Sequence, residues 1–234
     1  TKKKSSPCET NLQRLLTGQQ RDEFLQVLTE EEREHAKKLW ALWSRPEQRP
    51  PPTTEWDYWL YLAGRGAGKT RSGAEWIREQ VEEKNVTRVA LVGPTAADVR
   101  DVMCLGESGL IETSANDFRP VYEPSKRRLI WPNGAIATLY SSEEPDRLRG
   151  PQHEVSWSDE LAAWKSPETW DMLSFGMRLG RHPQSIITTT PKPTPFLKRI
   201  MRLPNLVTTR GSMLDNKVNL PDSFINAILN RYQG

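Results

Sequence analysis

The segment Leu62–Thr70, which reads LAGRGAGKT, constrains the fold of this chain more than any other part of the sequence. Three glycines and one lysine follow the apolar run Trp59–Leu62 and precede a segment with helical spacing. Glycine permits the φ angles and the close approach that a loop needs to point several backbone N–H groups at one anion. The following helix adds the positive end of its dipole. The pattern GxxxxGK[ST], with Ala63 at its first position, therefore predicts a phosphate-binding loop between a strand and a helix.

Each position of this loop has an expected role in binding a nucleotide. The residues expected to form the binding loop are Ala63, Gly64, Arg65, Gly66, Ala67, Gly68, Lys69 and Thr70. Lys69 would reach the β- and γ-phosphates, and the Thr70 hydroxyl would ligate Mg²⁺. Arg65 is either a second cation beside the phosphates or a solvated loop residue. A glycine-rich turn that binds nothing is the alternative for the whole loop, and the strand and helix around it count against that alternative.

A second acidic motif, EVSWSDE at Glu154–Glu160, lies downstream of the loop. Asp159 is expected to hold Mg²⁺ through water, and Glu160 to polarise the attacking water as general base. Neighbouring carboxylates at a strand end suit this division, because successive strand residues point to different faces. A lone Asp-Glu pair is usually a solvated surface feature, but its place after a phosphate loop favours phosphoryl transfer. The predicted strands at residues 88–92 and 135–140 lie between the loop and this pair. At least one inserted strand is typical of motor ATPases that use a glutamate base, and it counts against a small-molecule kinase.

Composition sets wider limits on the kind of protein. A chain of 234 residues can bury one sizeable core with a small appendage. Its apolar runs are too short to span a bilayer, and no apolar stretch follows the basic N-terminus as in a secretory signal. Cys8 and Cys104 lack CxxC spacing, which favours a reducing compartment over a disulfide framework or zinc site. The net charge of +3 weakly favours an anionic partner.

Short apolar strands alternate with helical segments along the chain. The predicted strands cover residues 58–62, 88–92, 127–131, 135–140, 154–158, 184–190 and 205–210. The predicted helices cover residues 71–83, 96–103, 167–176, 195–203 and 222–232, with one or two more within residues 19–44, where Thr29 and Glu32 form a capping-box pattern. Pro132-Asn133-Gly134 indicates a hairpin, and residues 1–18 are interpreted as a mobile tail. This alternation predicts an α/β fold with a mostly parallel sheet covered by helices on both faces.

Several motifs occur together in a characteristic order. They are RPEQRPP (45–51), LAGRGAGKTRSGAEW (62–76), VALVGPTAADVRDVM (89–103), LRG (148–150), WSDELAAW (157–164) and TTTPKP (188–193). The set resembles the ATPase domain of the large terminase subunit of tailed bacteriophages, the motor that packs DNA into procapsids. The resemblance covers about residues 45–200. It implies a P-loop NTPase fold of the ASCE, RecA-like type, with ATP and Mg²⁺ as cofactors and ATP hydrolysis that translocates double-stranded DNA into a procapsid.

The resemblance also implies roles for residues outside the two acidic and glycine-rich motifs. Gln48 would sense the adenine, and Thr188, Thr189 and Thr190 match the coupling motif that senses the γ-phosphate. A run of strand-favouring threonines is the alternative for those three. Arg149, or failing that Arg147, is the candidate arginine finger, acting in cis or on a neighbouring subunit; a salt-bridged loop arginine is the alternative.

Four basic residues are candidates for contact with DNA phosphates, independent of base sequence. Arg100 follows the second predicted strand, and Lys126, Arg127 and Arg128 form a cluster near the hairpin. A solvated charge run is the alternative for each of them.

The resemblance divides the chain into an N-terminal tail and helical segment (1–50), an ATPase core (51–200) and a lid or linker (201–234). Large terminases usually carry an additional RNase H-like nuclease domain; no acidic cluster of that kind follows here, so nuclease activity is not expected in this chain. The implied partners are double-stranded DNA, the portal and procapsid, the small terminase subunit and copies of the chain in a ring, expected to be a pentamer, in the cytoplasm of the bacterial host. No membrane partner is expected, and an isolated domain could stay monomeric.

Two other interpretations of the sequence remain open. A helicase-like P-loop ATPase would normally bring a second RecA-like domain. A non-catalytic module that docks on capsid or DNA would not need a general base such as Glu160.

Overall fold

The computed structural model describes residues 23–52 and 55–232, so the predicted tail at residues 1–18 lies outside the described part. The chain divides into two compact units, Thr1–Pro46 and Glu47–Gly234. Among the helices of the described residues, none is long and apolar enough to cross a membrane.

The first unit is helical. Residues 23–26 form a short helical turn, followed by α3 (Glu30–Lys38) and α4 (Trp40–Trp43). The predicted capping box is confirmed: the backbone N–H of Glu32 donates to Thr29 Oγ1, and the Thr29 N–H donates to Glu32 Oε2 at 2.9 Å. Both bonds satisfy N–H groups that have no partner within a helix, so this local sequence starts α3 where the pattern predicts it.

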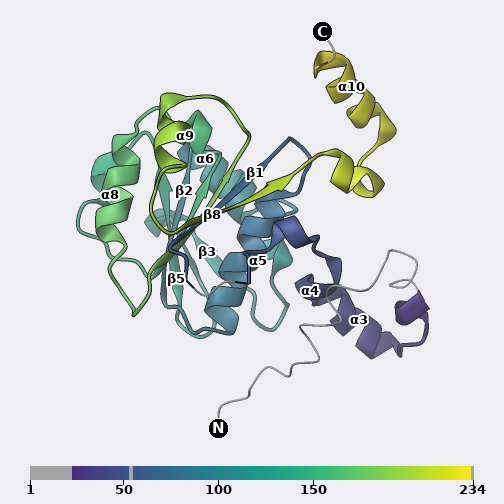
Figure 1. The fold of residues 1–234 in the computed structure, drawn as a ribbon. Coiled ribbons are helices and arrows are strands. Elements are labelled where there is room, and N and C mark those ends of the chain that lie inside the picture. The colour runs from purple at the N-terminus through teal and green to yellow at the C-terminus, as the bar shows by residue number, and fades with distance from the viewer. Residues whose placement is uncertain (1–22, 53–54, 233–234) are drawn as a thin grey trace. The chain divides into compact units, whose positions relative to one another are not determined.

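The second unit is built on one sheet of eight strands in the order β3-β4-β5-β2-β6-β7-β1-β8 (Figure 1). The strands are β1 (Tyr58–Ala63), β2 (Arg88–Gly93), β3 (Val121–Glu123), β4 (Arg128–Ile130), β5 (Ile136–Ser141), β6 (Val155–Asp159), β7 (Gln184–Thr189) and β8 (Leu206–Gly211). All pairs are parallel except β3 with β4 and β4 with β5. The prediction of a mostly parallel α/β sheet is confirmed, and β4 and β5 form the predicted hairpin.

The strand order differs from the sequence order in a way that matters for the site. The strand that separates β1 from β6 is β7, which comes after both of them in the chain. The two strands that the sequence suggested between the loop and the acidic pair, β2 and β5, lie on the other side of β6, as do β3 and β4. An inserted strand is therefore present as expected, but it is neither of the two strands that the sequence suggested.

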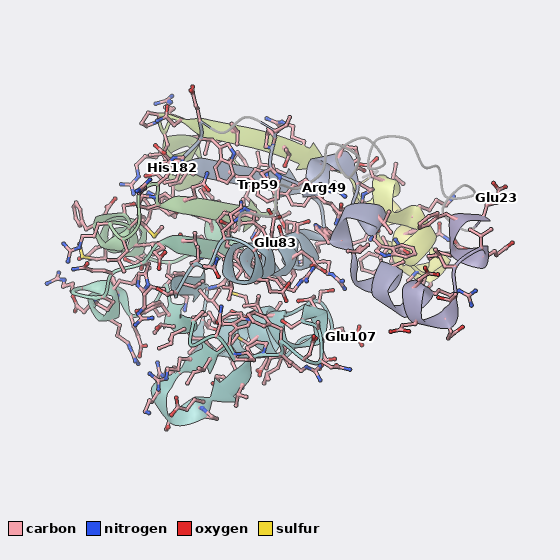
Figure 2. The ribbon with its side chains drawn as sticks, turned by 90° about the horizontal axis from the view of Figure 1, so that it is seen from below. Glu23, Arg49, Trp59, Glu83, Glu107 and His182 are labelled. Carbon is pink, nitrogen blue, oxygen red and sulfur yellow. The ribbon has the colours of Figure 1, made fainter. Side chains whose placement is uncertain are left out.

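Helices cover both faces of the sheet, and Figure 1 shows α5 (Lys69–Glu82) on one side with α8 (Glu168–Gly176) and α9 (Pro195–Ile200) on the other. The face of α5 buries Ala74, Ile77 and Val81 as predicted, in one cluster with apolar residues from β1, β2 and β6. The opposite cluster joins Trp170 and Leu173 of α8 to Leu60 and Ile187 of the sheet. Figure 2 shows this filled interior, with Trp59 inside it and His182 at its edge.

Smaller elements complete the unit. The remaining helices and turns are η1 (Pro46–Gln48), α6 (Ala96–Asp98), η2 (Val99–Cys104), α7 (Leu110–Thr113), η3 (Pro124–Lys126), η4 (Pro145–Leu148), η5 (Leu161–Ala163), η6 (Leu214–Asn219) and α10 (Asp222–Tyr232). The predicted helix at 96–103 is present but changes from α-helical in α6 to π-helical in η2. The sequence patterns did not predict β3, because its three residues are too few to show an alternating pattern.

The sheet extends into the segment that the sequence assigned to a lid. β8 pairs with β1 along its full length, from Tyr58 opposite Leu206 to Ala63 opposite Gly211. Residues 206–211 thus belong to the sheet, and η6 and α10 follow it. A division at residue 200 remains a prediction.

Candidate functional site

The phosphate loop has the conformation that its glycines predict. β1 ends at Ala63 and α5 begins at Lys69. Between them, Gly66 and Gly68 have φ angles of 72° and 81°, a left-handed region that glycine enters without strain. Gly68 is the N-cap of α5 and provides no side-chain cap. The first N–H groups of this helix are thus suited to an anion, and a strand, a glycine loop and a helix N-terminus follow one another as the motif requires.

Residues from outside the motif hold this loop in place. The Tyr61 hydroxyl donates to the carbonyl oxygen of Ala67 at 3.0 Å. The Asn216 side-chain amide donates to the carbonyl oxygen of Gly66 at 2.6 Å, and a Cβ at Gly66 would lie 3.0 Å from the Phe224 ring. The segment after β8 therefore contacts the loop, which sequence reasoning did not identify because Asn216 belongs to no recognisable pattern.

Gln48 lies at the same loop. Its side chain is buried, with 4% exposed, and its amide nitrogen is 3.4 Å from the carbonyl oxygen of Gly68 and 3.3 Å from Ser72 Oγ. The structure thus brings Gln48 to the end of the loop, across twenty positions of sequence.

Lys69 connects the loop to the acidic pair. Its ammonium group donates to the carbonyl oxygens of Ala63 and Gly64, at 3.2 and 3.1 Å, and lies 3.3 Å from Glu160 Oε1. An ammonium group has three donors, so these partners account for all of them. The Lys69 side chain is only 8% exposed, so its charge is held in place by the loop carbonyls and one carboxylate.

Asp159 ends β6 as a buried carboxylate, with 5% of the residue exposed. Thr188 Oγ1 donates to Asp159 Oδ1 at 2.6 Å. Burial raises the pKa of Asp159 to about 6. The hydrogen bond from Thr188 acts in the other direction and lowers this pKa. The negative charge of Glu160 raises it, and the positive charge of Lys69 lowers it. A buried carboxylate with this raised pKa is a group that a cation would stabilise in its ionised form.

The residues present fit a magnesium ion. Mg²⁺ prefers oxygen ligands and is usually bound through one or two carboxylates together with phosphate oxygens and waters. Asp159 supplies the buried carboxylate, and Thr70 supplies a hydroxyl in the first turn of α5. Asp159 ends β6, and Thr70 follows the loop at the end of β1, so both belong to the carboxyl edge of the parallel strands, where such sheets bind ligands.

Glu160 has a strained backbone. Its φ and ψ are both 44°, in the left-handed region that non-glycine residues rarely adopt. The strain turns the chain out of β6 so that the carboxylate meets Thr190, whose N–H and Oγ1 each lie 3.3 Å from a Glu160 oxygen. The Glu160 side chain is 35% exposed, so water can reach it. Strained residues of this kind cluster at functional sites, and this one orients a candidate base.

The three threonines line the acidic strand end. Thr188 is opposite Asp159 in the pairing of β6 with β7 and donates to it. Thr189 Oγ1 accepts from the Ala162 N–H at 3.0 Å, and Thr190 contacts Glu160. The parallel pairing of β7 with β6 thus brings the predicted coupling residues to both predicted carboxylates.

The candidate arginines make other contacts. Arg149 lies 3.0 Å from Asp146 and 3.4 Å from Glu168, with 61% of its side chain exposed. Arg147 lies 3.7 Å from Glu144. Arg65 is exposed and makes no ion pair with a described residue. The structure therefore does not join these arginines to the Lys69–Glu160 group within one chain.

The candidate DNA-contacting residues are ion-paired at the surface. Arg100 pairs with Asp101 at 2.6 Å, and Arg127 with Glu144 at 2.9 Å. Arg100, Arg127 and Tyr122 line a cavity of about 470 Å³ beside η2.

Lys126 and Arg128 do not line that cavity. They share one partner, Glu123, at 2.8 and 2.6 Å. The predicted basic cluster thus divides into two arginines at a cavity and two residues held on the β3–β4 hairpin.

Sequence reasoning missed Trp157, whose indole N–H donates to Thr188 Oγ1 at 2.8 Å. A signal was present, since Trp157 is two residues before Asp159 and must share its face of the strand. Its partner depends on the register of β7, which the sequence does not show.

Comparison with known proteins gives a family and a fold. Residues 60–206 match the family described as "Terminase large subunit, T4likevirus-type, N-terminal". A search of curated proteins finds no match.

Two solved phage terminases illustrate the similarity in fold. The large terminase of a thermophilic bacteriophage, in complex with ADP, has a TM-score of 0.64 at 16% identity, covering 81% of this chain and 50% of that one. The large terminase ATPase domain of Thermus phage P74-26 has a TM-score of 0.54 at 14% identity, covering 76% of this chain and 89% of that one. This chain thus spans about half the length of the ADP-bound terminase.

The family match extends over more than half of the chain, and it includes the glycine loop, the acidic strand end and the threonines described above. The chain therefore belongs to the large terminase subunits of the T4likevirus type and matches their N-terminal region.

Proposed function

We propose that this domain is the ATPase motor of a viral large terminase, which hydrolyses ATP to translocate double-stranded DNA into a procapsid. The observation that carries the proposal is the contact of Lys69 with Glu160, at 3.3 Å, beside the buried Asp159. It joins the glycine loop of β1 to the acidic end of β6 with β7 between them. The similar terminase of the thermophilic bacteriophage has been solved with ADP and with ATP-gamma-S, which supports a nucleotide ligand for this fold.

The residues of the loop would bind the phosphates, and Lys69 has a dual role in this proposal. A phosphate that attracts Lys69 would release Glu160 from its ion pair. The freed carboxylate would then accept a proton from the attacking water as general base. Thr70 and Asp159 would hold Mg²⁺, which supplies positive charge to the phosphate oxygens when it is bound.

The remaining residues would complete binding and coupling. Gln48 would recognise the adenine beside the loop, and Thr188–Thr190 would relay a change at Asp159 and Glu160 to the rest of the domain. Arg149, Arg147 or Arg65 would stabilise the transition-state charge, in cis or on a neighbouring subunit. Exposed ion pairs such as those of Arg149 contribute about 0–1 kcal/mol, so they can be exchanged for a phosphate at low cost.

The proposal extends to the assembled motor. Arg100, Lys126, Arg127 and Arg128 would contact DNA phosphates, which gives binding that weakens as salt rises. The domain would work in a pentameric ring with the portal, procapsid and small terminase subunit, in the host cytoplasm.

The test measures phosphate release and nucleotide binding on the same set of variants. Lys69→Ala should lose turnover, and Glu160→Gln should bind ATP without hydrolysing it. Lys84→Ala and Glu79→Gln are matched controls, because Lys84 and Glu79 form an exposed ion pair at 3.4 Å outside the site. Both controls should keep the wild-type rate.

The alternatives give different results. Equal turnover by wild type and Glu160→Gln would refute the assignment of the base. If the wild-type domain binds nucleotide but does not hydrolyse it, the isolated domain needs a group from a neighbouring subunit. If the wild-type domain binds no nucleotide, the interpretation as a non-catalytic docking module is favoured.

A further inference from the structure

We infer that Trp157 is a positioning residue for the metal-binding carboxylate: its indole N–H orients the Thr188 hydroxyl, which in turn orients Asp159. This inference rests on the proposed function of the site. It adds to that site a residue outside the loop, the acidic pair and the threonines.

The three side chains form a continuous buried chain of hydrogen bonds. Trp157 Nε1 donates to Thr188 Oγ1 at 2.8 Å, and Thr188 Oγ1 donates to Asp159 Oδ1 at 2.6 Å. Trp157 and Thr188 are fully buried and Asp159 is 5% exposed, so water does not compete for these bonds. Trp157 and Asp159 lie on one face of β6, and the pairing with β7 places Thr188 directly opposite Asp159.

The donor inventory fixes the direction of this chain. An indole N–H only donates, whereas a hydroxyl has one proton to donate and two lone pairs. With Trp157 occupying a lone pair, the single proton of Thr188 can go to Asp159 Oδ1 at 2.6 Å or to the Ser158 carbonyl oxygen at 3.5 Å. The shorter bond to a carboxylate is the stronger one, so the indole holds Thr188 as a donor to Asp159.

The helix that follows the phosphate loop, α5, packs closely against the Trp157 indole. A Cβ added at Gly73, in α5, would overlap the ring atoms of Trp157, including Nε1. Gly73 is four residues after Lys69, and its φ angle is not in the left-handed region. The glycine therefore serves close approach, and the helix that carries Lys69 packs directly on the indole that directs Asp159.

The fold contains a matched control for this arrangement. Trp59, on β1, is also fully buried, and its indole N–H donates to Thr209 Oγ1 at 2.9 Å. Trp59 lies in the interior in Figure 2. Both bonds join an indole N–H to a threonine hydroxyl. Thr209 lies in β8, however, and no hydrogen bond connects it to Asp159 among the described residues.

The experiment compares Trp157→Phe with Trp59→Phe, since each deletes one indole–threonine bond and keeps an aromatic ring. Two quantities are measured: the Mg²⁺ concentration for half-maximal ATP hydrolysis, and the Kd of a fluorescent ATP analogue with Mg²⁺ and with EDTA. We expect Trp157→Phe to raise the Mg²⁺ requirement about three- to tenfold, the range for one hydrogen bond, and to leave the Kd in EDTA within about twofold of wild type. Trp59→Phe should change neither.

A second set of variants tests whether Trp157 acts through Thr188. Thr188→Val should raise the Mg²⁺ requirement. Thr188→Ser keeps the hydroxyl, so its Mg²⁺ requirement should equal that of the wild type. In the double variant Trp157→Phe/Thr188→Val, the Mg²⁺ requirement should be no higher than in Thr188→Val alone, since coupled residues are not additive.

The outcomes separate this inference from the proposed function. Equal Mg²⁺ requirements for Trp157→Phe and Trp59→Phe, or effects of Trp157→Phe and Thr188→Val that multiply, would overturn the inference. A wild-type domain with no Mg²⁺-dependent nucleotide binding would instead refute the proposed function. If Trp157→Phe does not fold, Trp157→benzothienylalanine keeps the two-ring shape of the side chain, replaces only the N–H with sulfur and should produce the same increase.

Discussion

Replacing Glu160 with glycine should give a more stable domain than replacing it with alanine. Both substitutions remove the carboxylate, its ion pair with Lys69 and its contacts with Thr190, so these losses cancel in the comparison. The remaining difference is the backbone, which has φ and ψ of 44° at this position. Only glycine adopts that conformation without strain.

The expected size follows from two opposing effects. The left-handed conformation costs alanine about 1–2 kcal/mol relative to glycine. Glycine gains more freedom in the unfolded chain, which favours alanine by about 0.4–1 kcal/mol. Glu160→Gly should therefore be more stable than Glu160→Ala by about 0.5–1 kcal/mol, and both variants should be inactive in phosphate release.

Urea unfolding of the two variants measures this difference directly. Glu79, in the last turn of α5, is the control position, because in a helix alanine should be more stable than glycine, here by up to about 1 kcal/mol. The sign of the glycine–alanine difference should thus reverse between positions 160 and 79. Greater stability of Glu160→Ala over Glu160→Gly would refute the claim that backbone strain orients this carboxylate.

Two further predictions concern buried titratable groups. Burial lowers the pKa of His153 to about 4. Between pH 6.5 and 4 the unfolded chain therefore binds a proton that the folded chain does not. The free energy of unfolding should fall as the pH falls through that window, by up to about 3 kcal/mol. His153→Gln should lose this part of the pH dependence in urea unfolding, and an unchanged pH profile would contradict the assignment. Burial also raises the pKa of Cys104 to about 12, so in a Cys8→Ser variant no thiol should react with a disulfide reagent at pH 8 until urea unfolds the protein; rapid reaction in the folded state would contradict the burial.

Local patterns predicted elements in several parts of the chain. The capping box at Thr29, the start of α5 and the β4–β5 hairpin depend on residues a few positions apart, and all are present. The apolar face of α5 followed from 3.6-residue spacing in the same way. Elements with too little sequence escaped prediction, such as the three-residue strand β3 and the change to a π-helix in η2.

The contacts within the site were less predictable than its members. Gln48, Lys69, Asp159 and Glu160 were all identified from motifs, but the ion pair that joins Lys69 to Glu160 spans ninety-one positions of sequence. No single-sequence pattern reports such a distance. The free energy that decides it comes from the packing of the whole sheet.

By itself, the sequence determined that this chain has a strand, a phosphate loop and a helix, and an acidic strand end downstream. These features need particular residue types at short fixed spacings, because glycine conformations and helix N-termini are local properties. The tertiary structure alone decided that β7 lies between β1 and β6. That order brings the Thr188 hydroxyl into hydrogen-bond contact with Asp159 and the Trp157 indole into contact with Thr188. No motif specifies these contacts, because the register of parallel strands is set by the burial of apolar residues on both faces of the sheet.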